Sequence, residues 1–430
     1  MQTQARFSRR DLIKLAASGA AVTSLAGCAS MAGPPLGRVV VVGGGYGGAT
    51  AAKYLRLWGE GRIDVTLVEP SENFVSCPMS NLVIGGSKTM KDITIPYAGL
   101  SKYGVKVVRD TAARIDTDKR QVVLASGGTL GYDRLVLATG IEFMFEQVRG
   151  MSAAATQTIP HAWRAGAQTQ LLRDQLVAMR DGGTVVMSIP LAPYRCPPGP
   201  YERACQIAHY LKTAKPRSKL VVLDANPDLV SKKGLFLSVW NNDYKGLIDY
   251  RVNSPVSEVD VAGRQFVLEL GDKVGGDVLN LIPPQRAANI ARDSGVITAN
   301  NRWCEVDWVS LESVRVKNVH VVGDGTLSAP AMPKSGHMAN QHGKAVAAAI
   351  VELMNGRAPI PPMMANTCYS YVDAVNAVHV SSVHRWVPEK KPRETVPGSG
   401  GLSPVERTRW ALEGEYAWGW AQQIWADMLA

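Results

Sequence analysis

The fold is decided by residues 38–48, which read RVVVVGGGYGG and are followed by a helix-forming stretch. The run of valines predicts a buried strand of a parallel sheet. Gly43, Gly45 and Gly48 then occupy the three glycine positions of a dinucleotide-binding turn. Such glycines allow a tight bend, close approach of a pyrophosphate to the backbone, and close packing of the helix on the strand. The sequence therefore predicts a dinucleotide site at this turn.

The segments that follow favour FAD as the dinucleotide. A second strand, Asp64–Val68, ends at Glu69, 21 residues after the last of these glycines, where a carboxylate can bind ribose hydroxyls. The segments Tyr132–Gly140 and Val319–Gly325 resemble two later strands of flavoproteins that bind two dinucleotides. A helix that begins after Ser335 would direct its positive N-terminal end at the flavin and stabilise negative charge on the reduced ring.

Length and composition indicate a globular enzyme of several domains. The chain has 430 residues, which corresponds to about three domains at ~150 residues each. With 46% hydrophobic and 20% charged residues, disordered, collagen-like and coiled-coil classes are excluded. The formal charge is +10, but basic and acidic residues are interspersed, which argues against a nucleic-acid partner. The seven histidines show no metal-ligand spacing, so we expect no metal site.

We predict an α/β fold with two Rossmann-like dinucleotide-binding domains of the flavin disulfide reductase type and a small C-terminal α+β domain. The expected FAD-binding domain comprises residues 37–148 and 284–358, which return to complete it. Residues 149–283 are expected to form the second Rossmann-like domain, and residues 359–430 the C-terminal domain.

Residues 1–28 are predicted to be an export signal. Arg9 and Arg10 lie in a twin-arginine pattern, and the apolar stretch Leu15–Gly27 is too short to span a bilayer. This pattern predicts export of the folded protein to the periplasm. Residues 25–28, LAGC, also resemble a lipobox, in which Cys28 would carry a lipid anchor that tethers the protein to the membrane. Ordinary cleavage at these small residues is the alternative.

The second Rossmann-like domain lacks a nicotinamide site in its sequence. Its first strand, Gly183–Ile189, leads into the loop Pro190–Arg203, which is rich in proline where the fingerprint requires glycine. Prolines offer no N–H group to a pyrophosphate. Asp224, which ends the next strand, is then expected to bind no ligand. We therefore expect no NAD(P)H here, and electrons must enter from another reductant or leave to a partner protein.

Several segments resemble the flavoprotein subunit of flavocytochrome c sulfide dehydrogenase. They are the export signal, the first glycine turn and the stretches Phe74–Asn81, Pro160–Trp163, Arg195–Ala204, Asn280–Ala287, Met332–Gly336 and Asn366–Ser370. The resemblance covers nearly the whole mature chain, and the stretch CPPGPYE at residues 196–202 is highly specific.

The resemblance implies covalent FAD, attached through its 8α-methyl group to Cys77. It also implies a redox-active disulfide between Cys196 and Cys368 beside the flavin, with Glu202 close by, and electron transfer to a c-type cytochrome subunit. A disulfide sulfur is the natural electrophile for hydrosulfide, so the expected reaction is oxidation of hydrosulfide to sulfur or polysulfide. The residues do not decide which cysteine is attacked, or whether Glu202 moves a proton or only stabilises a helix N-terminus.

The expected cofactor-binding residues surround this site. They are Gly43, Gly45, Tyr46, Gly48, Glu69, Cys77, Asn81, Ala138, Thr139, Gly140, Asp324, Lys334, Ser335 and Gly336. Cys205 and Cys304 belong to no such site, and we expect both to pack in the core.

Two other functions are compatible with these residues. A sulfide:quinone-type reductase would use the same chemistry, and the absence of an amphipathic C-terminal membrane helix argues against it, although lipidation of Cys28 could supply the membrane. A catalytically silent flavoprotein that only carries electrons or binds a partner is the third function, and the intact Cys196 and Cys368 argue against it.

Overall fold

The strand–turn–helix unit expected at the first glycine turn is present in the computed structural model, which describes residues 33–389 and 393–430. The twin-arginine pattern and Cys28 lie outside these described residues. Within them, no helix combines the length and the apolar character needed to cross a membrane.

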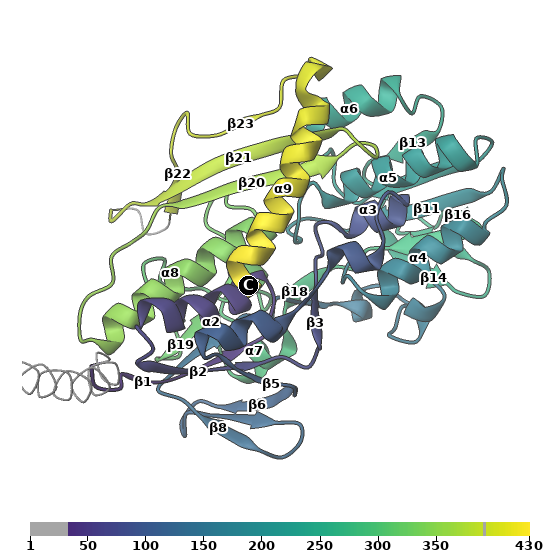
Figure 1. The fold of residues 1–430 in the computed structure, drawn as a ribbon. Coiled ribbons are helices and arrows are strands. Elements are labelled where there is room, and N and C mark those ends of the chain that lie inside the picture. The colour runs from purple at the N-terminus through teal and green to yellow at the C-terminus, as the bar shows by residue number, and fades with distance from the viewer. Residues whose placement is uncertain (1–32, 390–392) are drawn as a thin grey trace, which may run out of the picture.

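The first domain is built on a five-stranded parallel sheet with the order β19-β9-β1-β2-β5. Val39–Val42 of the central strand are buried, as expected for a strand inside a parallel sheet. Helices α2 and α8 lie side by side above this sheet (Figure 1). The bounds are β1 (Gly37–Val42), β2 (Ile63–Val68), β5 (Lys106–Val108), β9 (Arg134–Leu137), β19 (Val319–Val321), α2 (Tyr46–Trp58) and α8 (Gly336–Met354).

Smaller elements complete this domain and join it to the next one. Three short sheets are β3–β4, β6–β7–β8 and the antiparallel pair β10–β18. Their bounds, with those of two short helices, are β3 (Asn73–Val75), β4 (Thr94–Pro96), β6 (Ala112–Asp116), β7 (Gln121–Leu124), β8 (Thr129–Gly131), β10 (Ile141–Phe143), β18 (Gln285–Ala287), α3 (Ser80–Gly85) and α7 (Asn289–Asp293).

The second domain repeats the parallel arrangement with the strand order β13-β12-β11-β17. A three-stranded antiparallel sheet, β14–β15–β16, is attached to it. The bounds are β11 (Thr184–Ile189), β12 (Lys219–Asp224), β13 (Ile248–Arg251), β14 (Val256–Asp260), β15 (Gln265–Leu268), β16 (Lys273–Gly275), β17 (Val278–Leu281), α4 (Ala167–Ala178), α5 (Gly199–Ala214) and α6 (Lys233–Asn242).

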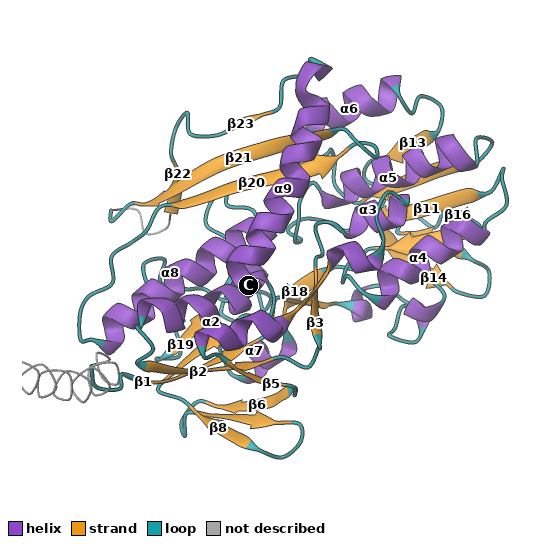
Figure 2. Cartoon of the chain, in the orientation of Figure 1, coloured by secondary structure: helices purple, strands orange, loops and turns teal. Residues whose placement is uncertain are grey.

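The C-terminal part consists of an antiparallel sheet crossed by one long helix (Figure 2). The helix ends beside α2, where Lys53 donates a hydrogen bond to the Ala426 oxygen and Tyr54 donates one to Asp427. Trp425 is buried in this contact, so the tryptophan-rich tail packs on the first domain. The bounds are β20 (Met364–Tyr371), β21 (Ala377–Trp386), β22 (Arg393–Thr395), β23 (Gly401–Leu402) and α9 (Trp410–Leu429).

The predicted fold class is confirmed, since two Rossmann-like parallel sheets and a C-terminal sheet with a helix are present. The first helix begins at Tyr46, earlier than the predicted Ala49, because the glycines of the turn form its first residues. Glycine has a low helix propensity, which is why the sequence pattern places the start later. Helix α5 likewise begins at Gly199, inside the segment Pro190–Arg203 that the sequence pattern assigns to a loop.

The contact of Gly48 with the turn before it makes a stability prediction. A Cβ atom at Gly48 would lie 1.8 Å from the Gly43 oxygen and 2.9 Å from the Ala138 Cβ. We expect Gly48→Ala to lower the free energy of unfolding by about 1–3 kcal/mol, because helix and strand must separate to admit the methyl group. Urea denaturation followed by circular dichroism measures this change.

Gly419 in α9 offers a matched control, because a Cβ atom there meets no other atom within 4 Å. Gly419→Ala should raise the free energy of unfolding by about 0.5–1 kcal/mol, since alanine favours the helix. Equal effects of the two substitutions would contradict the packing argument.

Candidate active site

A cavity of about 600 Å³ opens at the carboxyl ends of the strands of the first sheet, the usual place for a ligand in such folds. Its volume lies within the range of ordinary ligand sites, roughly 300–1,000 Å³. The predicted cofactor residues that line it are Gly43, Gly45, Tyr46, Glu69, Cys77, Asn81, Ala138, Thr139, Gly140, Asp324, Lys334, Ser335 and Gly336. Gly48 does not line the cavity, because it packs beneath the turn against Gly43.

The glycine turn presents bare backbone to this cavity. Gly43 has φ +97°, a left-handed conformation that suits glycine, and its N–H donates to the Val68 oxygen. A Cβ atom on Gly45 would meet no atom within 4 Å, so the backbone there is open to a close approach by phosphate. Glu69 accepts hydrogen bonds from the N–H groups of Gly44 and Ser71, which fixes its carboxylate at the end of β2.

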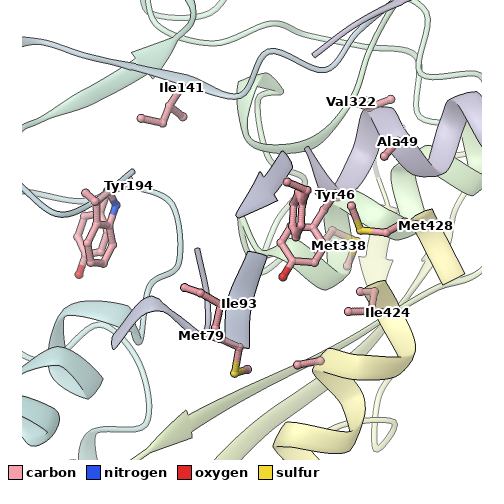
Figure 3. Close-up of a cluster of buried hydrophobic side chains, with 14 of the residues drawn as sticks. Tyr46, Ala49, Met79, Ile93, Ile141, Tyr194, Val322, Met338, Ile424 and Met428 are labelled. Carbon is pink, nitrogen blue, oxygen red and sulfur yellow. The ribbon is translucent and has the colours of Figure 1, made fainter. Parts of the chain in front are cut away.

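Tyr46, the first residue of α2, closes one side of the cavity. It belongs to the buried cluster drawn in Figure 3, together with Met338 of α8 and Met428 of α9. Its hydroxyl pairs with the Ser76 hydroxyl at 2.7 Å and accepts a hydrogen bond from the Trp425 indole. Helices from the first domain and from the C-terminal part therefore meet beside the cavity.

The residues present fit an FAD molecule. Oδ1 of Asp324 is buried without a hydrogen-bond partner, although the residue lines the cavity, so it is free to accept a bond from a ribityl hydroxyl. The N-terminus of α8 begins at Gly336 on the cavity wall, with Ser335 as its cap. Lys334 is buried, which lowers the pKa of its ammonium group to about 8. This positive end of the site suits a reduced, negatively charged flavin ring.

Cys77 lines the same cavity from the segment after β3. Its sulfur accepts hydrogen bonds from the Ala165 N–H at 3.2 Å and from the Arg195 guanidinium at 3.3 Å. The guanidinium also binds the Trp163 oxygen. Two donors, one of them charged, therefore converge on a half-buried cysteine sulfur at the cofactor cavity.

The other two predicted cysteines meet at the far side of the cavity. Cys196 lines it, with a left-handed φ of +54°, and its N–H donates to the Lys334 oxygen at 2.7 Å. Cys368 lies on β20 behind this lining, where its sulfur contacts the Asn366 amide at 3.4 Å. Burial raises the pKa of the Cys196 thiol, and negative charge on Cys368 raises it further. The two segments are also joined by hydrogen bonds, because Ser335, which follows the partner of the Cys196 N–H, donates to the same Asn366 side chain that contacts the Cys368 sulfur. Both are free thiols in the structure.

Glu202 is buried on α5, beyond the cavity lining. Its carboxylate accepts hydrogen bonds from the Tyr371 N–H at 2.9 Å and from the Asn81 amide at 3.2 Å. Burial raises the pKa of this group to about 7, against the opposing effects of those hydrogen bonds and of the charges on Lys232 and Arg203. The carboxyl group is therefore able to take up and release a proton near neutral pH.

Two basic residues of this region were missed by the sequence analysis. Arg203 is buried and donates hydrogen bonds to Asn81, His161 and Asn280, three residues from separate segments. Lys232 is also buried, and its ammonium group donates a hydrogen bond to the main-chain oxygen of Cys368. Arg203 directly follows the stretch CPPGPYE and Lys232 lies in no motif, and the roles of both follow only from contacts between distant segments.

The remaining cysteines and Asp224 have internal partners. Cys205 and Cys304 are fully buried, and the Trp240 indole donates to the Cys205 sulfur. Asp224 accepts hydrogen bonds from the hydroxyls of Tyr201 on α5 and Tyr250 on β13, so its carboxylate joins two elements of the second domain. In the described part of the chain, no group of three His, Cys, Asp or Glu side chains is arranged to hold a metal ion.

The raised pKa of Glu202 makes a prediction about stability and pH. Between pH 4.5 and about 7 the folded state keeps a proton that the unfolded state has lost. The contribution of Glu202 to the free energy of unfolding should therefore fall as the pH rises through this window, by on the order of 3 kcal/mol. In Glu202→Gln, which cannot ionise, this fall should disappear, and urea denaturation at pH 5 and pH 8 measures the difference.

Glu415, an exposed glutamate on α9, is the control position. Glu415→Gln should leave the difference between the two pH values as it is in the unmodified protein. The assignment would be contradicted if the free energy of unfolding of the wild-type protein changed between these two pH values in the same way as that of Glu202→Gln.

Comparison with known proteins relates all three parts of the chain to flavin enzymes. Residues 169–283 match the family described as sulfide dehydrogenase (flavocytochrome c) flavoprotein chain, central, and residues 360–429 match flavocytochrome c sulphide dehydrogenase, flavin-binding. Residues 37–185 match pyridine nucleotide-disulphide oxidoreductase.

Individual relatives point in the same direction. The chain is 65% identical over 46 residues to the sulfide dehydrogenase (flavocytochrome c) flavoprotein chain of Chlorobaculum thiosulfatiphilum, an alignment that covers 11% of this chain and 94% of that sequence. It is 25% identical over 308 residues to the mitochondrial sulfide:quinone oxidoreductase of Mus musculus, covering 67% of this chain. The alignment spans 65% of the mouse protein, just under two thirds of its length.

Solved structures show the same fold. The sulfide:quinone oxidoreductase of Aquifex aeolicus superimposes with a TM-score of 0.70 and 21% identity, covering 90% of this chain and 92% of that one. Putidaredoxin reductase, in its covalent complex with putidaredoxin, superimposes with a TM-score of 0.66 and 16% identity, covering 92% of this chain and all of that one.

Proposed function

The chain belongs to the flavoprotein family of flavocytochrome c sulfide dehydrogenase, and on that basis we propose that it oxidises hydrosulfide to sulfur or polysulfide and passes the electrons to a c-type cytochrome. The observation that carries this proposal is the position of Cys196, which lines the FAD cavity and has Cys368 as its neighbour. A dithiol pair next to a flavin is the arrangement that two-electron sulfur chemistry requires.

In the oxidised enzyme, Cys196 and Cys368 form the disulfide that hydrosulfide attacks. The S–S bond breaks, one cysteine becomes a persulfide, and the other leaves as a thiolate. Bound FAD supplies a two-electron acceptor at this point. Because Cys196 lies on the cavity wall, its sulfur is placed to donate the electron pair into the cavity. A second hydrosulfide attacks the outer sulfur of the persulfide and leaves with it as HSS⁻, which returns that cysteine to its reduced form. With both cysteines reduced, their S–S bond would re-form as the electron pair passes to the flavin that the cavity residues would hold.

Glu202 is proposed to manage the proton of this reaction. Burial raises the pKa of its carboxyl group to about 7, it accepts hydrogen bonds from Asn81 and Tyr371, and its negative charge raises the pKa of Cys196. In its ionised form it accepts the proton of the persulfide, and in its neutral form it returns a proton to the departing product. In the alternative role, the carboxylate only stabilises the start of α5, and a pKa near neutral pH would then serve no purpose.

NAD(P)H is proposed not to be a donor for this enzyme. The second-domain loop carries prolines in place of the glycine fingerprint, and Asp224 already binds two tyrosine hydroxyls. The export pattern of residues 1–28 supports a periplasmic site of action.

The disulfide mechanism predicts the behaviour of two cysteine variants. Cys196→Ser and Cys368→Ser should each slow the reduction of the flavin by hydrosulfide by roughly 10³-fold or more, because no electrophilic sulfur remains. Photoreduction of the flavin should be unchanged. Anaerobic stopped-flow absorbance at neutral pH measures both, and Cys304→Ser, which alters a buried cysteine outside the cavity, should reduce at the normal rate.

If the disulfide served only to join the C-terminal part to the second domain, both variants would have a lower melting temperature but normal flavin reduction.

The electron acceptor is tested with the same preparation of the enzyme. Reduced enzyme should be reoxidised faster by cytochrome c than by a soluble quinone, whereas preference for the quinone would assign the chain to the sulfide:quinone type, which its relatives also include.

Covalent attachment of FAD at Cys77 is a further part of the proposal. The donors from Ala165 and Arg195 stabilise negative charge on the sulfur, which favours its reaction as a nucleophile. Acid precipitation should leave the flavin with the wild-type pellet and release all of it from Cys77→Ala. Cys205→Ala, a buried cysteine outside the cavity, should retain its flavin as the wild type does. Complete release from the wild type would show that the attachment is absent.

A further inference from the structure

Lys232 is a buried lysine held in an unfavourable backbone conformation. It directly precedes α6, has φ +52° and is only 4% exposed. A left-handed conformation is uncommon for a residue with a long side chain, so the surroundings must impose it. Its ammonium group donates hydrogen bonds to the Cys368 oxygen at 2.6 Å, the Ser370 hydroxyl at 2.9 Å and the Val378 oxygen at 3.1 Å.

These three acceptors satisfy the donors of the ammonium group but do not neutralise its charge, because all three are neutral oxygens. The groups whose negative charge stabilises it are, in order, Cys368, Glu202, Cys196 and Glu413. The carboxylate of Glu413 already has its own partners, because it is hydrogen-bonded to His379 and Ser403. The positive charges of Arg203 and Arg195 act on the Glu202 and Cys196 side of the site.

We infer that Lys232 is a positioning residue that supplies the positive counter-charge for the thiolate formed when the bond between Cys196 and Cys368 is opened. This role rests on the proposed function. In the opening step HS⁻ forms a bond to one sulfur, the S–S bond breaks, and its electron pair leaves on the other sulfur as a thiolate. One negative charge enters the buried site with HS⁻ and remains there on the thiolate or on the persulfide after proton transfer.

Two considerations favour this role over a purely structural one. A neutral amide could donate hydrogen bonds to the same oxygens, whereas burying an ammonium group costs several kcal/mol unless a negative charge offsets that cost. Burial also lowers the pKa of Lys232 to about 8, so the charge is still present at neutral pH and is lost in alkaline solution. The ammonium group binds the main-chain oxygen of Cys368 itself, and negative charge on Cys368, Glu202 and Cys196 opposes the effect of burial on its pKa.

The reactivity of the reduced cysteines tests this inference without using sulfide. Only thiolates react with iodoacetamide, so the rate of alkylation reports how well the site stabilises them. The reduced protein is treated at pH 6 to pH 9, and mass spectrometry follows the peptides of Cys196 and Cys368 separately. Lys232→Gln keeps hydrogen-bond donors without the charge, Lys232→Met removes both, and Lys232→Arg keeps the charge.

At pH 7, Lys232→Gln and Lys232→Met should alkylate about tenfold more slowly than the wild type at one or both cysteines, which corresponds to a rise of one pKa unit. The difference should shrink above pH 8, where the wild-type lysine loses its proton. Lys232→Arg should react at the wild-type rate at pH 7, because it restores the charge. Even if Lys232→Met fails to fold, Lys232→Gln keeps the comparison available.

Lys53 provides the matched control, because it is a second buried lysine whose ammonium group binds main-chain oxygen, in its case beside the end of α9. Lys53→Met should leave both alkylation rates unchanged. Wild-type rates in Lys232→Gln, or an equal slowing in Lys53→Met, would overturn the inference. A wild-type protein that hydrosulfide cannot reduce would overturn the proposed function while leaving the alkylation result intact, so the two failures are distinguishable.

Discussion

The site depends on two neighbouring buried residues of α5, Glu202 and Arg203, because they connect all three parts of the molecule. Arg203 donates hydrogen bonds to Asn81 of the first domain and to Asn280 of the second. Glu202 accepts one from Asn81 and one from the Tyr371 N–H of the C-terminal sheet. Removing either residue would leave buried polar groups from different domains without partners, at a cost of several kcal/mol.

Burying these charged groups lowers the free energy of unfolding, which indicates that they are present for function and not for stability. Burial opposes the charged forms of Glu202, Arg203 and Lys232 alike, as the direction of each pKa shift shows. An apolar core of the same volume would be at least as stable. A buried site with more positive than negative groups is useful, however, when the reaction itself moves a proton and creates a thiolate. The excess charge that chemistry introduces is then met by groups already in place.

The sequence predicted those features whose signal is local. The strand before Gly43 and the packing role of Gly48 follow from periodicity and from the chemistry of glycine over a few residues, and the fold class followed from them. The family resemblance brought Cys77, Cys196 and Cys368 to attention, but spacing alone left their roles open. Lys232 and Arg203 could not be found in this way. Lys232 reaches Cys368 across 136 residues and Arg203 reaches Asn81 across 122, and no periodic pattern records such contacts.

The proposed absence of a nicotinamide site and the proposed sulfur site depend on the same loop, Pro190–Arg203. A nucleotide-binding turn needs free N–H groups, yet in the loop after β11 those of Ala192, Arg195 and Cys196 donate to Asn226, Gln285 and the Lys334 oxygen. The prolines between them have no N–H to offer. These same bonds fix Cys196 against the flavin cavity and direct Arg195 to Cys77. By holding Cys196 in this way, the loop uses N–H groups that a second dinucleotide would need.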